Sequence, residues 1–265
     1  MTPSSVVPAP REAPNALFEL LLRLGDDRLV LGHRLSEWCG HGPILEEDIA
    51  ISNVALDLLG QATMFLRLAG EVEGQGRDED ALAYFREVVE FRNAQLVELP
   101  RGDFAFTIAR QFLFDVHAVV LLDALSHSAH AGIAAIAAKS LKEAKYHVRH
   151  SGEWMLKLGD GTDESHRRMQ AAIDALWRFT PELFAADDVD REMMAQGVAP
   201  DLTAVHSQWD AIVRDVIDRA TLTLPHDVPR AANARGGRHG AHTEHLGHML
   251  AEMQIIARSH PGATW

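Results

Sequence analysis

Prolines are concentrated near the two ends of this chain, and that distribution limits what it can fold into. Of eleven prolines, four lie in residues 1–14 and three near the C-terminal end, which leaves Pro43, Pro100, Pro181 and Pro200 between them. Because proline ends or kinks a helix, the proline-free stretches rich in Ala and Leu predict long helices that break near those residues. No segment shows sustained alternation of apolar and polar residues, so we expect an all-α fold.

Apolar residues recur at three- and four-residue steps along most of the chain. In the first such stretch the helical face carries Leu17, Leu21, Leu24, Leu31 and Leu35. The predicted helices span residues 15–39, 45–71, 80–98, 103–126, 131–158, 163–184, 202–222 and 243–259. Residues 1–14 are predicted to be a disordered, Pro-rich tail, and residues 225–240 a long surface loop. We expect residues 15–265 to form one domain, a helical bundle with a helical C-terminal extension.

Acidic residues outnumber basic ones by 38 to 25, which gives a formal net charge of −13. Nucleic acid is therefore not expected as a partner, since phosphate binding needs clustered Lys and Arg. No run approaches the roughly 20 uninterrupted apolar residues of a spanning helix, and the N-terminus lacks the pattern of a signal peptide. Cys39 is the single cysteine and has no partner for an internal disulfide, which fits a reducing compartment. We expect a cytoplasmic protein without membrane contact.

Fifteen histidines in a helical bundle suggest a dinuclear iron or manganese site. Such bundles hold two metals with a Glu-x-x-His pair on each of two helices, because residues three apart share one helix face. No Glu in this sequence is followed three residues later by His. The nearest approach is Glu143, where Tyr146 occupies the third position and His147 lies about 100° further round the helix.

Several polar residues nevertheless lie close to the predicted core stripes. They are Glu37, Asn53, Asp57, Asp115, Glu143 and His147, together with His33, His117 and His150. One interpretation is a degenerate metal site that holds an ion through His147 and some carboxylates. The other is a buried network of hydrogen bonds and paired charges, with Arg28, Arg110 and Lys139 as counter-ions. We favour the network, and so predict no metal and no catalytic residue, because both Glu-x-x-His pairs are missing.

Four histidines near the C-terminus are spaced three apart: His239, His242, His245 and His248. Steps of three place His245 and His248 on one helix face, where they would be able to bind a divalent metal adventitiously. The first two lie in or beside the predicted Gly-rich loop. We therefore do not predict a dedicated metal site from this cluster.

Several long strings resemble one protein family. They are RLGDDRLVLGHRLSEWCGHGPILEEDIAISNVALDLLGQA, TIARQF, KEAKYHVRHS, LGDGTDES, LWRFTPELF and HTEHLGHMLAEMQ. Together they are similar to the structural, non-catalytic subunit of the ring-1,2-phenylacetyl-CoA epoxidase, a bacterial multicomponent oxygenase. The resemblance runs from about Leu22 to Trp265 and leaves only the Pro-rich tail outside.

That resemblance implies a ferritin-like fold and a set of partners. The partners would be a homologous catalytic subunit that keeps the di-iron ligands, a small adaptor subunit, and a reductase with FAD, an iron-sulfur centre and NADPH. The complex would insert one oxygen atom from O2 across the aromatic ring of phenylacetyl-CoA, in aerobic phenylacetate degradation. This subunit would carry no cofactor, would not be catalytic alone, and would scaffold the di-iron subunit.

The resemblance also implies contacts to the CoA substrate. Carried over by local match, they fall on Glu90, Phe91, Arg92 and Asn93 in the predicted helix 80–98, and on Arg191, Glu192 and Met193. Arg92 and Arg191 would neutralise CoA phosphates, and Phe91 would lie against the adenine or the pantetheine. The same segments are equally typical of a solvated helix face and a surface turn, so both interpretations stay open.

Two alternatives to a scaffolding subunit remain at this point. One is a stand-alone ferritin-like di-metal oxidase with atypical ligands. The other is a helical module that serves an oxygenase acting on a different aryl-CoA.

Overall fold

The computed structural model describes residues 15–225 and 236–263, and in these ranges it contains helices and turns but no strand. The predicted tail 1–14 and the middle of the predicted loop 225–240 lie outside the described residues. The α-helices are α1 (Ala16–Ser36), α2 (Leu45–Glu73), α3 (Glu79–Tyr84), α4 (Gln95–Glu98), α5 (Phe104–Leu125), α6 (Ala131–Gly159), α7 (Asp163–Leu176), α8 (Asp188–Ala195), α9 (Leu202–Arg219) and α10 (Glu244–Ser259). Short 3-10 helices are η1 (Val88–Glu90), η2 (Trp177–Phe184) and η3 (Gly237–His239). The predicted all-α helical bundle is confirmed.

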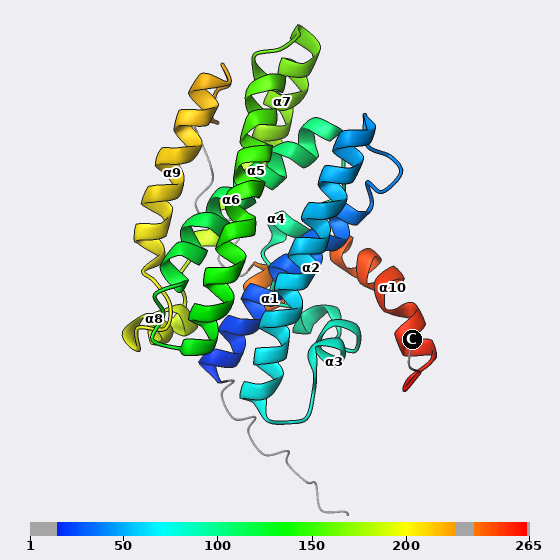
Figure 1. Cartoon of the computed structure of the whole chain (residues 1–265), viewed down its shortest axis with the longest axis vertical. Coiled ribbons are helices and arrows are strands. Elements are labelled where there is room, and N and C mark those ends of the chain that lie inside the picture. Colours follow the sequence, from blue (N-terminus) through cyan, green and yellow to red (C-terminus); the bar gives the residue numbers. More distant parts are fainter. Residues whose placement is uncertain (1–14, 226–235, 264–265) are drawn as a thin grey trace, which may run out of the picture.

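Two long antiparallel pairs, α1 with α2 and α5 with α6, form the body of the bundle (Figure 1). α1 and α2 approach closely because α1 carries glycines where they cross: a Cβ on Gly25 would lie 2.7 Å from Leu66 Cδ2, and one on Gly32 would lie 3.1 Å from Leu59 Cδ2. Apart from four residues, all of α1 is buried, including its charged side chains Arg23, Asp26, Asp27, Arg28 and Arg34. α1 is thus the central helix of one half of the molecule.

The other half of the core forms where α7, η2 and α9 pack on α5 and α6 (Figure 1). Trp209 on α9 is buried, stacks on Trp177 with ring centroids 5.5 Å apart, and donates its Nε1–H to the carbonyl oxygen of Leu113 at 2.9 Å. These contacts satisfy the indole N–H while the ring contributes apolar burial. They fix α9 along one edge of the bundle.

Most predicted helices agree with the structure within a few residues, but the helix predicted over residues 80–98 is wrong. The chain there forms α3, the short η1, an extended stretch and the four-residue α4. The side chains of Asp26 and Asp27 on α1 accept the backbone N–H groups of Arg92 and Ala94, each at 2.8 Å. Those carboxylates replace the partners that a continuous helix would have supplied. The predicted helix 163–184 continues as η2 from Trp177, and α8 was not predicted.

The C-terminal extension begins at η3 and ends in α10, which stands out from the bundle on the side opposite α9 (Figure 1). Its inner face packs on the α3 region, where Gln254 donates hydrogen bonds to the carbonyl oxygens of Ala83 and Arg86 at 3.0 and 3.1 Å. The segment is therefore held by buried polar contacts as well as by apolar packing.

Among the described residues, α2 and α5 are long and apolar enough to cross a membrane by length and composition alone, a test that buried core helices also pass. In α5 the most apolar stretch is 89% buried in the bundle, as expected of a core helix. In α2 the corresponding stretch is only 44% buried, so much of its apolar surface is not covered by the described residues.

Candidate functional site

The interior between α1, α2 and α6 is filled by a chain of polar side chains, which we call the interior polar chain: Arg28, Gln61 and Glu143. Arg28 Nε donates to Gln61 Oε1 at 2.9 Å, and Gln61 Nε2 donates to Glu143 Oε2 at 2.8 Å. Arg28 is fully buried, its guanidinium lies 5.0 Å from the centre of the Phe65 ring, and burial lowers its pKa to about 10. The Arg28 cation therefore lies among the polar side chains that were candidate metal ligands, such as Glu143.

Asp57, Asp115 and His147 lie near that chain but are satisfied by other protein groups. His147 Nε2 lies 3.0 Å from Asp57 Oδ2, and Asp115 accepts hydrogen bonds from Gln111 Nε2 at 2.6 Å and Ser151 Oγ at 2.8 Å. The remaining predicted positions diverge: Asn53 is exposed, and Glu37 pairs with Arg34 at 2.6 Å near the surface. In residues 15–225 and 236–263, no three His, Cys, Asp or Glu side chains are placed to hold a metal ion.

The buried network was predicted with the wrong counter-ions. Arg28 contacts an amide oxygen and the carbonyl oxygen of Leu24, while Arg110 contacts the carbonyl oxygens of Leu99 and Pro100. Lys139 Nζ lies 3.8 Å from the sulfur of Met64 on α2. Helical periodicity placed these cations near the core but did not identify their partners, most of which come from loops and neighbouring helices.

Replacing Asp115 by Asn is expected to raise the free energy of unfolding at pH 7.5 by about 1–3 kcal/mol. Burial raises the pKa of Asp115 to about 6, above its usual 3.8, so the folded chain binds this proton more tightly. The resulting stabilisation is complete below about pH 4 and is lost as the pH rises through about 6. Urea denaturation from pH 4 to 8 should show a flatter profile for the variant. Asp123→Asn, on the exposed side of α5, should leave the profile unchanged; a less stable Asp115→Asn protein at pH 7.5 would contradict this account.

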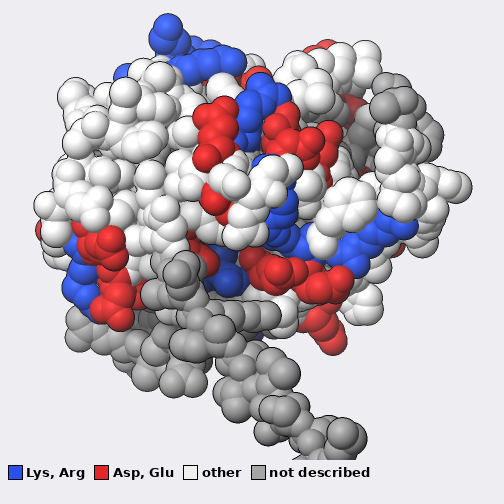
Figure 2. Space-filling view, turned by 90° about the horizontal axis from the view of Figure 1, so that it is seen from below, with Lys and Arg blue, Asp and Glu red and all other residues white. Residues whose placement is uncertain are grey.

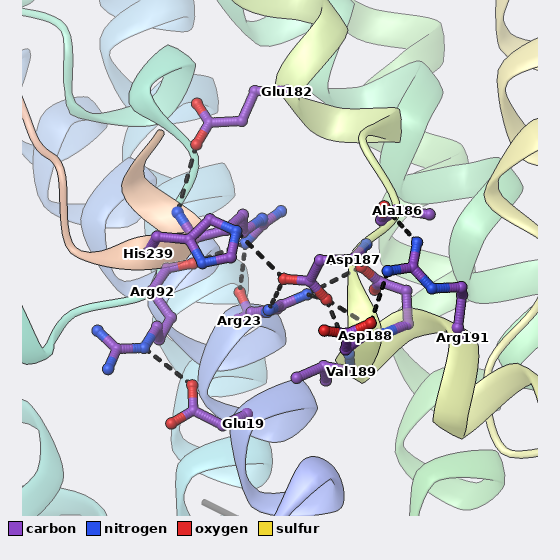
Figure 3. Close-up of polar contacts among 12 residues, drawn as sticks. Glu19, Arg23, Arg92, Glu182, Ala186, Asp187, Asp188, Val189, Arg191 and His239 are labelled. Carbon is purple, nitrogen blue, oxygen red and sulfur yellow. Dashed lines mark hydrogen bonds and ion pairs between the residues drawn. The ribbon is translucent and has the colours of Figure 1, made fainter. Parts of the chain in front are cut away.

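Charged side chains of α1 hold distant segments together by ion pairs. Asp26 pairs with Arg86, and Asp27 pairs with Arg238, whose Nη2 lies 2.7 Å from Asp27 Oδ2. Arg23 reaches Asp190 at 2.9 Å and also binds Asp187, as Figure 3 shows for the latter. Long-range pairs of this kind bring the segments around residues 86–94, 182–190 and 236–242 onto one helix.

A surface pocket of about 330 Å³, which we call the arginine pocket, opens where those segments meet. Its lining comprises Glu19, Arg23, Arg92, Asp187, Asp188, Val189, Arg238 and His239. Figure 3 shows Arg92 directed to Glu19 and the side chains of Arg23 and His239 directed to Asp187. Viewed from below, acidic and basic residues alternate over the face in Figure 2, without a broad basic patch. An anion would bind here only in competition with the carboxylates.

Of the residues proposed to touch CoA, only Arg92 lines the arginine pocket, while the segment 191–193 follows the lining residues 187–189 along α8. Arg92 lies in the pocket wall, where its Nε donates to Glu19 at 2.8 Å, and Arg191 on α8 pairs with Asp188 at 2.7 Å. Phe91 is buried under the guanidinium of Arg86 at 4.3 Å, so its ring has no free face for adenine in this chain. The residues Asn93 and Met193 are also buried, whereas Glu90 and Glu192 are exposed. Glu90 to Asn93 lie in η1 and the extended stretch, which corrects their predicted helical placement.

Sequence reasoning missed three residues that build this pocket: Arg23, Asp187 and Arg238. Asp187 is the N-cap of α8, where its side chain accepts hydrogen bonds from the backbone N–H groups of Val189 and Asp190. The Asp-x-x-Asp spacing at residues 187–190 is a capping-box signal that predicts this helix start. Arg23 and Arg238 carry no such local signal.

The C-terminal histidines are not gathered into one cluster. His239 lies 3.3 Å from Asp187, whereas the buried side chain of His242 contacts Glu98 Oε2 at 2.9 Å and the carbonyl oxygen of Phe91 at 3.1 Å. His245 and His248 follow on α10. The first two histidines therefore serve contacts between the extension and the bundle.

Comparison with known proteins agrees with the sequence resemblance. One of the subunits of the 1,2-phenylacetyl-CoA epoxidase of Escherichia coli (strain K12) is 50% identical over 251 residues, which cover 95% of this chain and 100% of that protein. The sequence model of the family described as "Phenylacetic acid catabolic protein" matches residues 5–265. The chain therefore belongs to the family of phenylacetic acid catabolic proteins.

Proposed function

We propose that this chain is a non-catalytic subunit of a phenylacetyl-CoA epoxidase that acts in phenylacetate degradation. The observation that carries the proposal is the interior polar chain, in which the buried cation Arg28 and the amide of Gln61 occupy the space between α1, α2 and α6. A buried guanidinium repels a dication and donates where metal ligands must accept. The E. coli relative, named as one subunit of this enzyme, supports a role within an assembly.

In this proposal the chemistry belongs to other subunits. A homologous ferritin-like subunit holds the di-iron centre, an adaptor subunit assists it, and a reductase with FAD, an iron-sulfur centre and NADPH supplies electrons. This chain scaffolds the di-iron subunit in the cytoplasm and helps to hold the CoA part of the substrate. The other subunits are the source of all redox cofactors.

Metal analysis of the purified chain tests the non-catalytic role. The chain expressed alone in medium with iron and manganese should contain well under one equivalent of either metal by plasma mass spectrometry. Two tightly bound equivalents would contradict the proposal and favour a stand-alone di-metal oxidase. The substrate is tested separately, by assaying the complex with phenylacetyl-CoA: a stable complex without turnover would favour a module that serves another aryl-CoA oxygenase.

The CoA contact predicts an effect of Arg92 on substrate affinity. In the assembled complex, Arg92→Gln should raise the KM for phenylacetyl-CoA about threefold to tenfold and leave kcat unchanged, because a part-exposed Arg–phosphate contact contributes on the order of 1 kcal/mol. Arg214→Gln, on the exposed side of α9, is the matched control. An unchanged KM would remove Arg92 from the substrate site.

A further inference from the structure

The outer face of α2 carries an uncharged seam. Its exposed residues between positions 49 and 63 are Ile49, Asn53, Leu56, Gly60 and Thr63. The steps between them are four, three, four and three, which is the spacing by which a helix packs on another helix. Ile49 and Leu56 are 52% and 66% exposed, so the seam lacks a partner among the described residues. We call this set the α2 seam.

Gly60 in the middle of the seam is not required by packing against residues 15–225 and 236–263. A Cβ added there would meet nothing within 4 Å, whereas one on Gly25 in α1 would clash with Leu66. Glycine in a helix interior costs about 1 kcal/mol relative to alanine. A glycine with open space around it therefore fits close approach by a surface that the described part of the chain does not supply.

A basic row on α6 borders the α2 seam. All four lysines of the chain lie on α6, at Lys139, Lys142, Lys145 and Lys157, and Arg149 follows the same outer side. Lys139 reaches across to Met64 on α2, next to the end of the seam. Figure 1 shows α2 and α6 on the near side of the bundle.

Among the residues that the structure describes, these cations have no carboxylate partner, unlike most exposed arginines. In the described ranges, Lys139, Lys142, Lys145 and Arg149 have no carboxylate oxygen within 4.0 Å. By contrast, Arg67, Arg168, Arg214 and Arg219 each pair with a nearby carboxylate. An unpaired basic row on a chain of net charge −13 is complementary to a surface that carries carboxylates, and such a surface would belong to another molecule.

We propose that the α2 seam and the basic row form the docking surface for a helix of another subunit, one whose apolar face is bordered by carboxylates. This inference rests on the proposed function, since it assumes an assembly. We infer another subunit rather than a second copy of this chain, because the same face of a copy carries a second basic row and no row of carboxylates to match it. Two of the carboxylates near the seam, Asp57 and Glu143, are already bonded to His147 and Gln61.

Lysine labelling tests the surface directly, because amine reagents modify α6 and the N-terminal amine only. The chain is labelled with an acetylating reagent alone and after co-purification with the other subunits of the E. coli phenylacetyl-CoA epoxidase. Modification of Lys139, Lys142 and Lys145, followed by peptide mass spectrometry, should slow about tenfold or more in the complex. Lys157, at the end of α6, is the internal control. A complex with unchanged labelling overturns the docking surface and leaves the proposed function standing, whereas absence of any complex overturns both.

Substitutions at Gly60 separate docking from folding. Gly60→Ala should raise the melting temperature by about 2–4 °C. Gly60→Leu should fold normally but weaken the complex about tenfold or more, because the added side chain meets only the partner. Ala211→Leu places the same bulk on exposed α9 and should have no effect on assembly. Equal affinities for the Gly60→Leu and unmodified chains would overturn the inference.

Two further measurements address other occupants of the surface. Sedimentation should show a monomer for the chain alone, and a dimer whose lysines are protected would overturn the inference in favour of a second copy. Flotation with phosphatidylglycerol vesicles should show no binding. Vesicle binding that protects the same lysines would overturn it in favour of a lipid surface.

Discussion

Replacing Asp26 by alanine is expected to lower the free energy of unfolding by about 3–5 kcal/mol, the typical result of removing one partner of a buried ion pair. The Asp26 side chain is 0% exposed and that of Arg86 is 2% exposed. Asp26 accepts hydrogen bonds from Arg86 Nη1 at 2.9 Å and from the backbone N–H of Arg92 at 2.8 Å. The substitution leaves a guanidinium buried without a counter-charge and a backbone donor without a partner. Urea denaturation followed by far-UV circular dichroism measures the loss.

The control for that experiment is a surface ion pair of the same type. Asp215 pairs with Arg219 on α9 at 3.0 Å, with side chains 64% and 58% exposed. Asp215→Ala should change the free energy of unfolding by about 0–1 kcal/mol, because water solvates both partners. If Asp26→Ala costs no more than Asp215→Ala, then the buried pair does not hold residues 86–94 on α1.

Replacing Arg238 by methionine is expected to release the C-terminal extension from the bundle before the rest of the chain unfolds. Arg238 donates to Asp27 Oδ1 and Oδ2 at 2.9 and 2.7 Å and to the carbonyl oxygen of Arg92 at 2.9 Å. Loss of these contacts should destabilise docking of residues 236–263 by about 3 kcal/mol or more, since Asp27 would remain buried without its cation. Hydrogen-exchange mass spectrometry should show about a hundredfold faster exchange in α10, because a loss of about 3 kcal/mol in docking free energy raises the population of the undocked form about a hundredfold.

Two variants decide whether this release is specific to the buried pair. Arg258→Met, also in the extension, removes a part-exposed pair with Glu87 and hydrogen bonds to the carbonyl oxygens of Tyr84 and Arg86. Because it leaves no buried charge unpaired, it should speed exchange in α10 far less than Arg238→Met does. The double substitution Asp27→Leu with Arg238→Met removes both charges and should recover part of the lost docking energy. Wild-type exchange in α10 of the Arg238→Met chain would show that apolar contacts alone hold the extension.

The long helices were predictable because their signals are local. Leu21, Leu24, Leu31 and Leu35 recur at helical spacing, and all four are buried in α1. The same pattern gave no indication that α1 is buried on nearly every side, because a periodicity of apolar residues does not register buried charges. The charges of Arg23, Asp26 and Asp27 on α1 are compensated by residues far along the chain. Only the folded structure identifies those partners.

In the segment 80–98, local sequence signals predicted a helix that tertiary contacts prevent. Its Ala, Leu, Glu and Arg content favours a helix, but the carboxylates of Asp26 and Asp27 bind its backbone N–H groups and hold it extended. Tertiary contacts override intrinsic propensity here. The proposed CoA residues at 90–93 were therefore placed on the wrong element. Their proximity to residues 187–191, across the arginine pocket, had no local sequence signal.

The absence of Glu-x-x-His pairs was predictable from residue spacing alone, since both members of such a pair lie on one helix. The polar side chains that occupy the interior between α1, α2 and α6 were not predictable in this way. Arg28, Gln61 and Glu143 come from three helices, and their hydrogen bonds depend on how α1, α2 and α6 pack. The spacing of residues along one helix therefore shows that a known ligand pattern is absent. The hydrogen bonds between helices depend on tertiary packing, which local spacing does not specify.

The pairing of Asp27 with Arg238 has a consequence for how the chain folds during synthesis. The two residues are 211 positions apart, and Asp27 lies on α1, which leaves the ribosome before the other helices of the bundle. Until Arg238 emerges, the Asp27 carboxylate lacks the cation that it pairs with in the folded chain, so burial of that face is unfavourable. We therefore expect nascent chains truncated before residue 236 to remain protease-sensitive in α1 and to acquire protection only after Arg238 has emerged.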